Sequence, residues 1–199
     1  MLEQLIHIDT QILLFVNGHH TPIVDTLMLA ISGKFTWSPL YAFLLYLIFR
    51  DNKWMGFYIL IFVVLTITLA DQSSVRLFKN VFMRPRPCWE PSVKDLLHMV
   101  QRCGGKYGFV SSHAANSFAI LTLILGLFKG KYKWLKWVMW TWALLIIYSR
   151  VYLGVHYPGD VLGGAILGFL LGKLVLFLYF KSKYWIWGKE DFNKQVEDA

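Results

Sequence analysis

Residues 149–160 read SRVYLGVHYPGD and join two long apolar stretches of the chain. In this spacing Arg150 can hold an oxyanion, His156 can attack phosphorus, and Asp160 can orient the imidazole from four residues away. Pro158 is typical of the first turn of a helix, so His156 is expected at the mouth of that helix and Asp160 inside its first turn. The stretch therefore predicts a polar phosphate-handling turn between two apolar helices.

Two further polar blocks lie upstream. Lys79 is followed, after six residues, by Arg86-Pro87, and residues 111–113 read Ser-Ser-His. A phosphomonoester and its transition state carry negative charge on several oxygens, which fixed cations stabilise without reorganisation. We therefore expect Lys79, Arg86 and Arg150 to bind the phosphate.

In this order, the three blocks resemble the type 2 phosphatidic acid phosphatase superfamily, which includes lipid phosphate phosphatases and vanadium haloperoxidases. The first and third blocks match that pattern fully. In the middle block, Val110 and Ser112 stand at the Pro and Gly positions of the usual Pro-Ser-Gly-His, whereas Ser111 and His113 are retained. The resemblance covers residues 55–180 and implies a membrane helix bundle that hydrolyses phosphoesters.

The resemblance also implies a role for each site residue. His156 is the expected nucleophile, forming a phosphohistidine, and His113 the general acid that later activates water. Ser111 and Ser112 are expected at the phosphate, through a hydroxyl and through backbone N–H groups at a helix N-terminus. Asp160 orients the imidazole, caps the helix, or does both.

No cofactor is expected, because the cations are side chains of the protein. No Asp, Glu and His residues have metal-ligand spacing, so the sequence predicts no metal site. The remaining histidines match no motif and are expected on the surface, namely His7, His19, His20 and His98. Arg84 is interpreted as an interface anchor, with contact to a second phosphate as the alternative.

The composition indicates a polytopic membrane protein. Of 199 residues, 56% are hydrophobic and only 16% are charged, which is unusual for a soluble domain. The net charge of +8 does not indicate nucleic-acid binding, because the basic residues cluster at the ends of apolar stretches. We expect a single all-α domain over residues 1–199.

Hydropathy predicts about five spans. The first carries Gly33, Lys34 and Pro39, so we expect it to be kinked or broken. Residues 1–17 alternate apolar and polar faces at helical spacing and are predicted to lie in the membrane interface, with a sixth span as the alternative. The expected spans are residues 24–49, 54–78, 112–129, 134–150 and 158–181.

Alternating crossings place all three blocks on one membrane face. The opposite face carries Lys129, Lys131, Lys133 and Lys136 in one short loop, which marks it as cytoplasmic by the positive-inside rule. The tail, residues 182–199, falls on that side as well. The active site is therefore expected outside the cytoplasm, facing the periplasm or exterior of a bacterial inner membrane.

The longest loop, residues 88–108, lies on the active-site face and holds both cysteines of the chain. An extracytoplasmic loop permits a disulfide between Cys88 and Cys103, which would stabilise the fold by roughly 3 kcal/mol in the chain-entropy model. Two free thiols are the alternative. The resemblance implies that this loop covers the site.

The leading functional hypothesis is a metal-independent lipid phosphate phosphatase whose partner molecules are the bilayer and a lipid substrate. Phosphatidate, phosphatidylglycerol phosphate, polyprenyl diphosphate and the 1-phosphate of lipid A all remain open as substrates. Two alternatives use the same fold, a non-catalytic lipid-binding or lipid-transfer protein and a vanadate-dependent peroxidase. The full set of candidate site residues argues against the former and the membrane spans against the latter.

Overall fold

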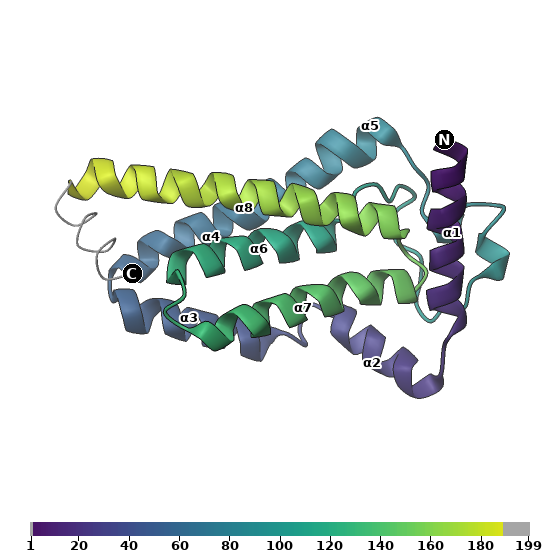
Figure 1. Ribbon diagram of the computed structural model, residues 1–199, viewed down its shortest axis with the longest axis horizontal. Coiled ribbons are helices and arrows are strands. Elements are labelled where there is room, and N and C mark those ends of the chain that lie inside the picture. The colour runs from purple at the N-terminus through teal and green to yellow at the C-terminus, as the bar shows by residue number, and fades with distance from the viewer. Residues whose placement is uncertain (1, 189–199) are drawn as a thin grey trace.

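The computed structural model describes residues 2–188, and these form a bundle of long helices with one helix lying across its end (Figure 1). The sequence prediction of an all-α fold is confirmed, since the described residues contain no strand. The helices are α1 (Leu2–Gly18), α2 (Pro22–Ser32), α3 (Ser38–Asn52), α4 (Met55–Ser73), α5 (Asn80–Phe82), α6 (Ser112–Phe128), α7 (Lys133–Tyr152) and α8 (Pro158–Trp187).

The first expected span is broken, as predicted. Helix α2 ends at Ser32 and α3 begins at Ser38, with Pro39 in its first turn. The carbonyl groups left free at the end of α2 accept bonds from the connection, since Trp37 Nε1 donates to the carbonyl of Ile31 at 2.8 Å. Side-chain donors thus allow the chain to change direction here.

The second expected span is longer than predicted. A π-helical segment, η1 (Ser74–Lys79), joins α4 to α5, so the helical stretch Met55–Phe82 has 28 residues. Helix α8 also runs past residue 181 and reaches Trp187, so the predicted tail begins with helix and its residues 189–199 lie outside the described part. By length and composition these two stretches are long and apolar enough to cross a membrane. The number of spans stays a prediction.

The centre of the bundle is the contact between α6 and α8, which run side by side (Figure 1). Gly164, Gly168 and Gly172 recur every four residues on one face of α8, against Ala115 and Ala119 of α6. A Cβ atom added at Gly168 would lie 2.2 Å from the carbonyl oxygen of Ala115. Small residues therefore let the two backbones approach closely, as in membrane helix pairs.

The outward faces of the long helices are apolar and exposed. On α4 and α8 these residues include Ile61, Val64, Ile166, Phe169 and Leu170. Such a surface would be unstable in water but suits contact with lipid. These exposed apolar faces are typical of an integral membrane protein.

Helix α1 crosses the end of the bundle and contacts α7 and α8 (Figure 1). Asp9, Leu13 and Asn17, spaced by four residues, face the bundle, whereas Ile6 and Ile12 are exposed. An exposed apolar face on a crosswise helix suits the membrane interface. That interfacial position of residues 1–17 stays a prediction.

Candidate active site

The turn between α7 and α8 carries the expected nucleophile. Gly154 adopts the left-handed conformation (φ 69°), which glycine tolerates, and Pro158 opens α8. His156 lies in this turn and is only 1% exposed, and Asp160 lies in the first turn of α8. The local structure predicted from the sequence is thus the structure observed.

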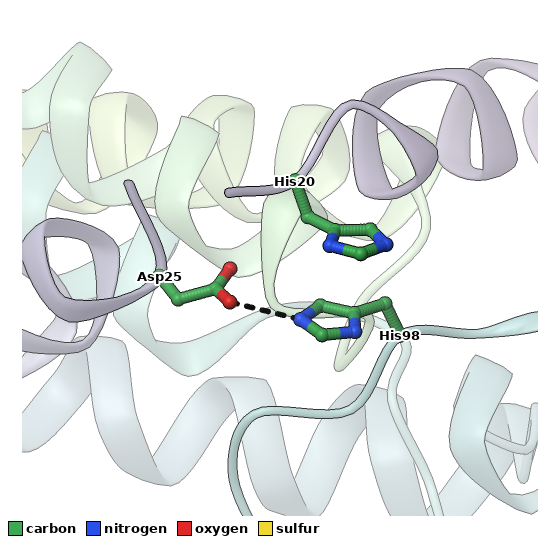
Figure 2. A group of neighbouring side chains, drawn as sticks. All are labelled: His20, Asp25 and His98. Atoms are coloured by element: carbon green, nitrogen blue, oxygen red, sulfur yellow. Dashed lines mark hydrogen bonds and ion pairs between the residues drawn. The ribbon is translucent and has the colours of Figure 1, made fainter. Parts of the chain in front are cut away.

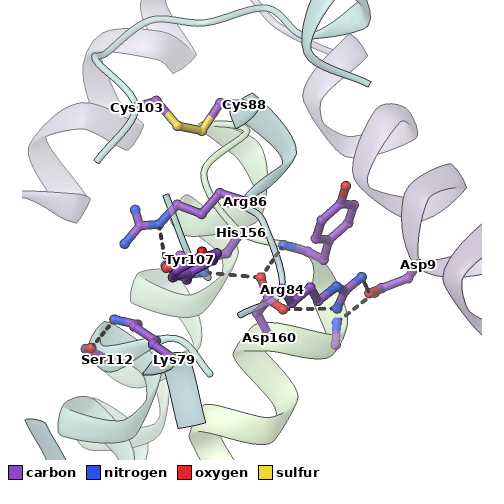
Figure 3. A network of polar contacts seen from close by, with 12 residues as sticks. Asp9, Lys79, Arg84, Arg86, Cys88, Cys103, Tyr107, Ser112, His156 and Asp160 are labelled. Carbon is purple, nitrogen blue, oxygen red and sulfur yellow. Dashed lines mark hydrogen bonds and ion pairs between the residues drawn. A yellow bond between two sulfur atoms is a disulfide. The ribbon is translucent and has the colours of Figure 1, made fainter. Parts of the chain in front are cut away.

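Asp160 contacts the imidazole of His156 and caps the start of α8 (Figure 3). Its Oδ2 lies 3.3 Å from Nδ1 of His156 and accepts the backbone N–H of Tyr157 at 3.1 Å. With the Nδ1 proton directed at the carboxylate, Nε2 of His156 keeps a free lone pair. This arrangement is the one expected if His156 acts as a nucleophile.

The electrostatic surroundings keep His156 neutral. Burial lowers the pKa of His156 well below its ordinary value, and the positive charges of Arg86 and Arg150 lower this pKa further. A neutral imidazole is the form that can attack phosphorus. The same positive charges would attract a phosphate group to this turn.

Lys79 and the middle motif meet at one hydroxyl. Lys79, at the end of η1, donates from Nζ to Oγ of Ser112 at 2.6 Å (Figure 3). The same Oγ lies 2.7 Å from the hydroxyl of Ser74. Ser112 thus contacts Lys79 directly and links the first motif to the start of α6.

The long loop is longer than the predicted 88–108, since it runs over residues 83–111, and it holds Arg86 in place. The backbone N–H of Arg86 donates to the carbonyl of Lys106 at 2.9 Å, and its Nε donates to the carbonyl of Tyr107 at 3.3 Å. Burial lowers the pKa of Arg86, although the nearby Asp160 opposes this. The loop therefore holds this guanidinium near His156, in the turn between α7 and α8 (Figure 3).

Two buried donors at the site have no hydrogen-bond partner among residues 2–188. They are Nε of Arg150 and the hydroxyl of Ser111. Arg150 is 7% exposed and donates through another nitrogen to the hydroxyl of Ser32. Buried donors rarely stay unpaired, so an anion that accepts from these groups would remove an energetic cost.

His113 lies one residue inside α6, and Ser111, directly before α6, anchors that helix to the first turn of α8. The backbone N–H of Ser111 donates to the carbonyl of Asp160 at 2.9 Å. This bond brings the middle motif against the third motif. His113 is half-buried at the same end of the bundle.

Arg84, interpreted from the sequence as an interface anchor, belongs instead to the active-site network. It donates to Asp160 at 3.0 Å and to Asp9 of α1 at 2.7 Å, and it lies over the ring of Tyr157. Asp9 also accepts the backbone N–H of Gly159 at 2.7 Å. Asp9 belongs to no motif, so no pattern in the sequence could have identified it.

Gly108 is a second residue that the motifs did not reveal. A Cβ atom added there would lie 2.9 Å from Oδ2 of Asp160, 3.0 Å from Cγ of Arg86 and 3.5 Å from Nδ1 of His156. A glycine is therefore needed for the long loop to pass this close to the catalytic pair.

The structure joins Cys88 and Cys103 by a disulfide, with their Cα atoms 6.0 Å apart. Both cysteines lie in the long loop, beside Arg86 (Figure 3). The bridge closes the part of the loop that bonds to Arg86. It thereby restricts the loop next to Arg86, which is expected to bind the phosphate.

Comparison with known proteins agrees with these motifs. The PAP2 superfamily matches residues 54–184. The chain is 41% identical to the lipid A 4'-phosphatase of Bacteroides thetaiotaomicron, over 91% of this chain and 81% of that protein. It is 31% identical to the undecaprenyl-diphosphatase of Sulfolobus acidocaldarius, over 88% of this chain and 79% of that protein.

A solved structure agrees as well. The crystal structure of a transmembrane PAP2 type phosphatidylglycerolphosphate phosphatase from Bacillus subtilis superposes with a TM-score of 0.67 at 26% identity, covering 89% of this chain and 87% of that one. The family resemblance drawn from the three motifs is confirmed.

Proposed function

Because the chain belongs to the PAP2 superfamily of membrane phosphatases, and thus acts on lipid phosphates, we propose that it does so through a phosphohistidine formed on His156. One observation carries this proposal, namely a buried neutral His156 whose Nδ1 faces Asp160 and whose surroundings are cationic. The contacts around Asp160 support the orienting role, and the unpaired donors of Arg150 and Ser111 support phosphate binding.

In the first step, Lys79, Arg86 and Arg150 hold the non-bridging oxygens of the phosphate. Nε2 of His156 attacks phosphorus, and the bond from phosphorus to the lipid oxygen breaks. His113 protonates that oxygen, so that the lipid leaves as an alcohol.

In the second step, His113 takes a proton from water, and the resulting hydroxide attacks the phosphohistidine. The phosphorus–nitrogen bond breaks, inorganic phosphate leaves, and His156 returns to its neutral form. The protein's own cations supply the charge that both steps need, so we infer that hydrolysis does not depend on a divalent metal.

The inferred substrate is a phosphate monoester on a lipid of the lipid A class. The strongest support is the similarity to a protein named lipid A 4'-phosphatase over most of both chains. The structure adds a physical argument, because two donors of Arg84 are already engaged by Asp9 and Asp160. Arg84 is thus occupied within the network, which favours a monoester over a diphosphate.

A polyprenyl diphosphate is the second candidate, since a relative of similar coverage is named undecaprenyl-diphosphatase. Release of phosphate by the purified protein should be measured with lipid A, phosphatidate, phosphatidylglycerol phosphate and undecaprenyl diphosphate. We expect the highest kcat/KM with lipid A. Faster turnover of undecaprenyl diphosphate would reverse the substrate assignment while leaving the mechanism intact.

The nucleophile is tested by His156→Ala, with His19→Ala, at an exposed position directly after α1, as the control. We expect His156→Ala to abolish hydrolysis and acid-labile labelling by a radioactive substrate, and to keep the fold. The control should match the wild type. Substantial hydrolysis by well-folded His156→Ala protein would disprove the mechanism, as would a strict requirement for Mg²⁺.

We also propose that the site faces away from the cytoplasm, because the Lys-rich connection between α6 and α7 lies at the other end of the bundle (Figure 1). In sealed cells, an impermeant maleimide should label Cys88 and Cys103 only after reduction. A cysteine at position 133, introduced as Lys133→Cys in a background lacking both native cysteines, should react only after the membrane is opened. Labelling of position 133 in sealed cells would invert the orientation.

A further inference from the structure

Three side chains outside the phosphate site converge on one point, namely His20, Asp25 and His98 (Figure 2). One nitrogen or oxygen of each lies within 4.8 Å of the others. His20 precedes α2, Asp25 lies in its first turn, and His98 belongs to the long loop. Because His98 is 73 residues from Asp25 in the sequence, spacing along the chain gave no sign of a shared site.

The separation of Asp25 and His98 suits two ligands of one ion. Nε2 of His98 lies 2.9 Å from Oδ2 of Asp25. Two bonds of about 2.1 Å to a common ion would meet at about 90° across that gap, within the range that transition metals accept. No large movement of either side chain is needed.

Both groups are held in place by a second layer of contacts. The hydroxyl of Tyr152 donates to Oδ1 of Asp25 at 2.7 Å, so that Oδ2 is the oxygen that faces His98. Buried Asn17 accepts the backbone N–H of His98 at 2.8 Å and donates to its carbonyl at 3.0 Å. Outer contacts of this kind orient metal ligands in proteins.

The third side chain, His20, is close but stacked. Its ring lies parallel to that of His98, with centroids 3.5 Å apart and planes 6° apart (Figure 2). An imidazole nitrogen binds a metal in the plane of its ring, so His20 must tilt to share an ion with His98. His20 is exposed and lies in the short connection between α1 and α2, where such a rotation meets little resistance.

We propose that His20, Asp25 and His98 bind a divalent transition-metal ion of the Zn²⁺ class. Two imidazoles and one carboxylate suit Zn²⁺ and related ions, with water completing the coordination. This site is separate from the phosphate-binding groups and takes no part in the chemistry at His156.

The position of the site predicts that a bound ion would hold the long loop in place. The neighbours of His98 pack on the catalytic turn, since Met99 Sδ and Leu97 Cδ1 would lie 3.1 and 3.6 Å from a Cβ atom added at Gly154. Gly154 is two residues from His156. A bound ion would therefore tie the long loop to α2 directly beside the nucleophile.

The probe is Zn²⁺ titrated calorimetrically into metal-stripped protein in detergent. We expect one ion per chain. His98→Ala and Asp25→Asn should each weaken binding at least about 100-fold, and Tyr152→Phe about 10-fold, because it removes an outer contact. The exposed His7 of α1 supplies a matched control, and His7→Ala should leave the affinity unchanged.

A second measurement follows the loop itself. Exposed Lys94 and Arg102 flank His98, so trypsin should cut the long loop more slowly with Zn²⁺ bound, as judged after reduction of the disulfide. His98→Ala should abolish this protection. Equal binding by the His98→Ala and His7→Ala proteins, or no binding by the wild type, would overturn the proposal. Neither result depends on phosphatase activity.

Discussion

Helices α6 and α1 both hold the start of α8, but by opposite means. Helix α6 meets α8 through glycine and alanine, with backbone against backbone. Helix α1 meets it through charge, because Asp9 accepts from Arg84 and from the N–H of Gly159. Close apolar packing fixes where α8 lies, whereas the charged contacts fix the carboxylate of Asp160 next to His156. Substitutions at the two contacts should therefore affect different quantities.

The largest effect is expected at the α6–α8 contact. In Gly168→Ala the new Cβ would overlap the carbonyl of Ala115, which neither backbone can avoid without separating the helices. We expect a loss of at least about 3 kcal/mol in the free energy of unfolding, with activity lost together with the fold. Thermal unfolding in detergent measures this loss.

Gly105→Ala is the matched control, because a Cβ atom at Gly105 would meet nothing within 4 Å. A Gly168→Ala protein as stable as Gly105→Ala would show that the two helices can move apart at little cost. The claim that close packing against α6 fixes the position of α8 would then be wrong.

The contact with α1 should affect the rate rather than the fold. Without Asp9, Arg84 is free to bond Asp160 alone, which changes the charge felt by His156. We expect Asp9→Ala to lower kcat about 100-fold with little change in KM or in melting temperature, and Asp9→Asn to lower it less. Glu3→Ala, on the exposed part of the same helix, should retain the wild-type kcat. Equal kcat values for Asp9→Ala and Glu3→Ala would remove α1 from the catalytic network.

The burial of His156 predicts a pH-dependent stability. Its pKa is well below the ordinary value of 6.5 in the folded protein, so below pH 6.5 the unfolded chain binds more protons and stability falls. Above pH 6.5 this residue adds no pH dependence. Between pH 6.5 and 5.0 the loss is at most about 2 kcal/mol. The free energy of unfolding of the wild type and of His156→Gln, measured at both pH values, isolates the contribution of His156. The same loss of stability in both proteins would contradict a buried neutral His156.

The smallest effect is expected at Gly108, in the part of the long loop that lies against Asp160 and Arg86. Gly108→Ala places a Cβ atom against Asp160 and Arg86, so the side chains must shift by a few tenths of an ångström. We expect kcat/KM to fall about 10-fold, because catalysis is sensitive to small misplacement, while the fold persists. The rate of phosphate release by Gly108→Ala should be compared with that of Gly105→Ala, which lies in the same loop. Equal rates would mean that the loop can move to accommodate the new Cβ atom without affecting catalysis.

The comparison also explains what could be predicted. The turn at 153–157 was predictable because Pro158 and the histidine-to-aspartate spacing act within a few residues of one another. The break in the first span was predictable from Gly33 and Pro39 for the same reason. By contrast, Arg84 resembled any basic residue at the end of a span, and only its two carboxylate partners distinguish it.

The sequence by itself determined the all-helical membrane class, the family and the chemical types gathered for phosphate transfer. These follow from hydropathy and from short-range spacing, which any segment carries in its own residues. Only the tertiary structure decided that Asp9 and Arg84 support Asp160, that Gly108 lies against His156, and that His20 and Asp25 meet His98. Those contacts join residues that are remote along the chain, and they depend on how closely α6 packs on α8 and where α1 crosses the bundle. No local pattern encodes such distances, because packing of the whole bundle sets them.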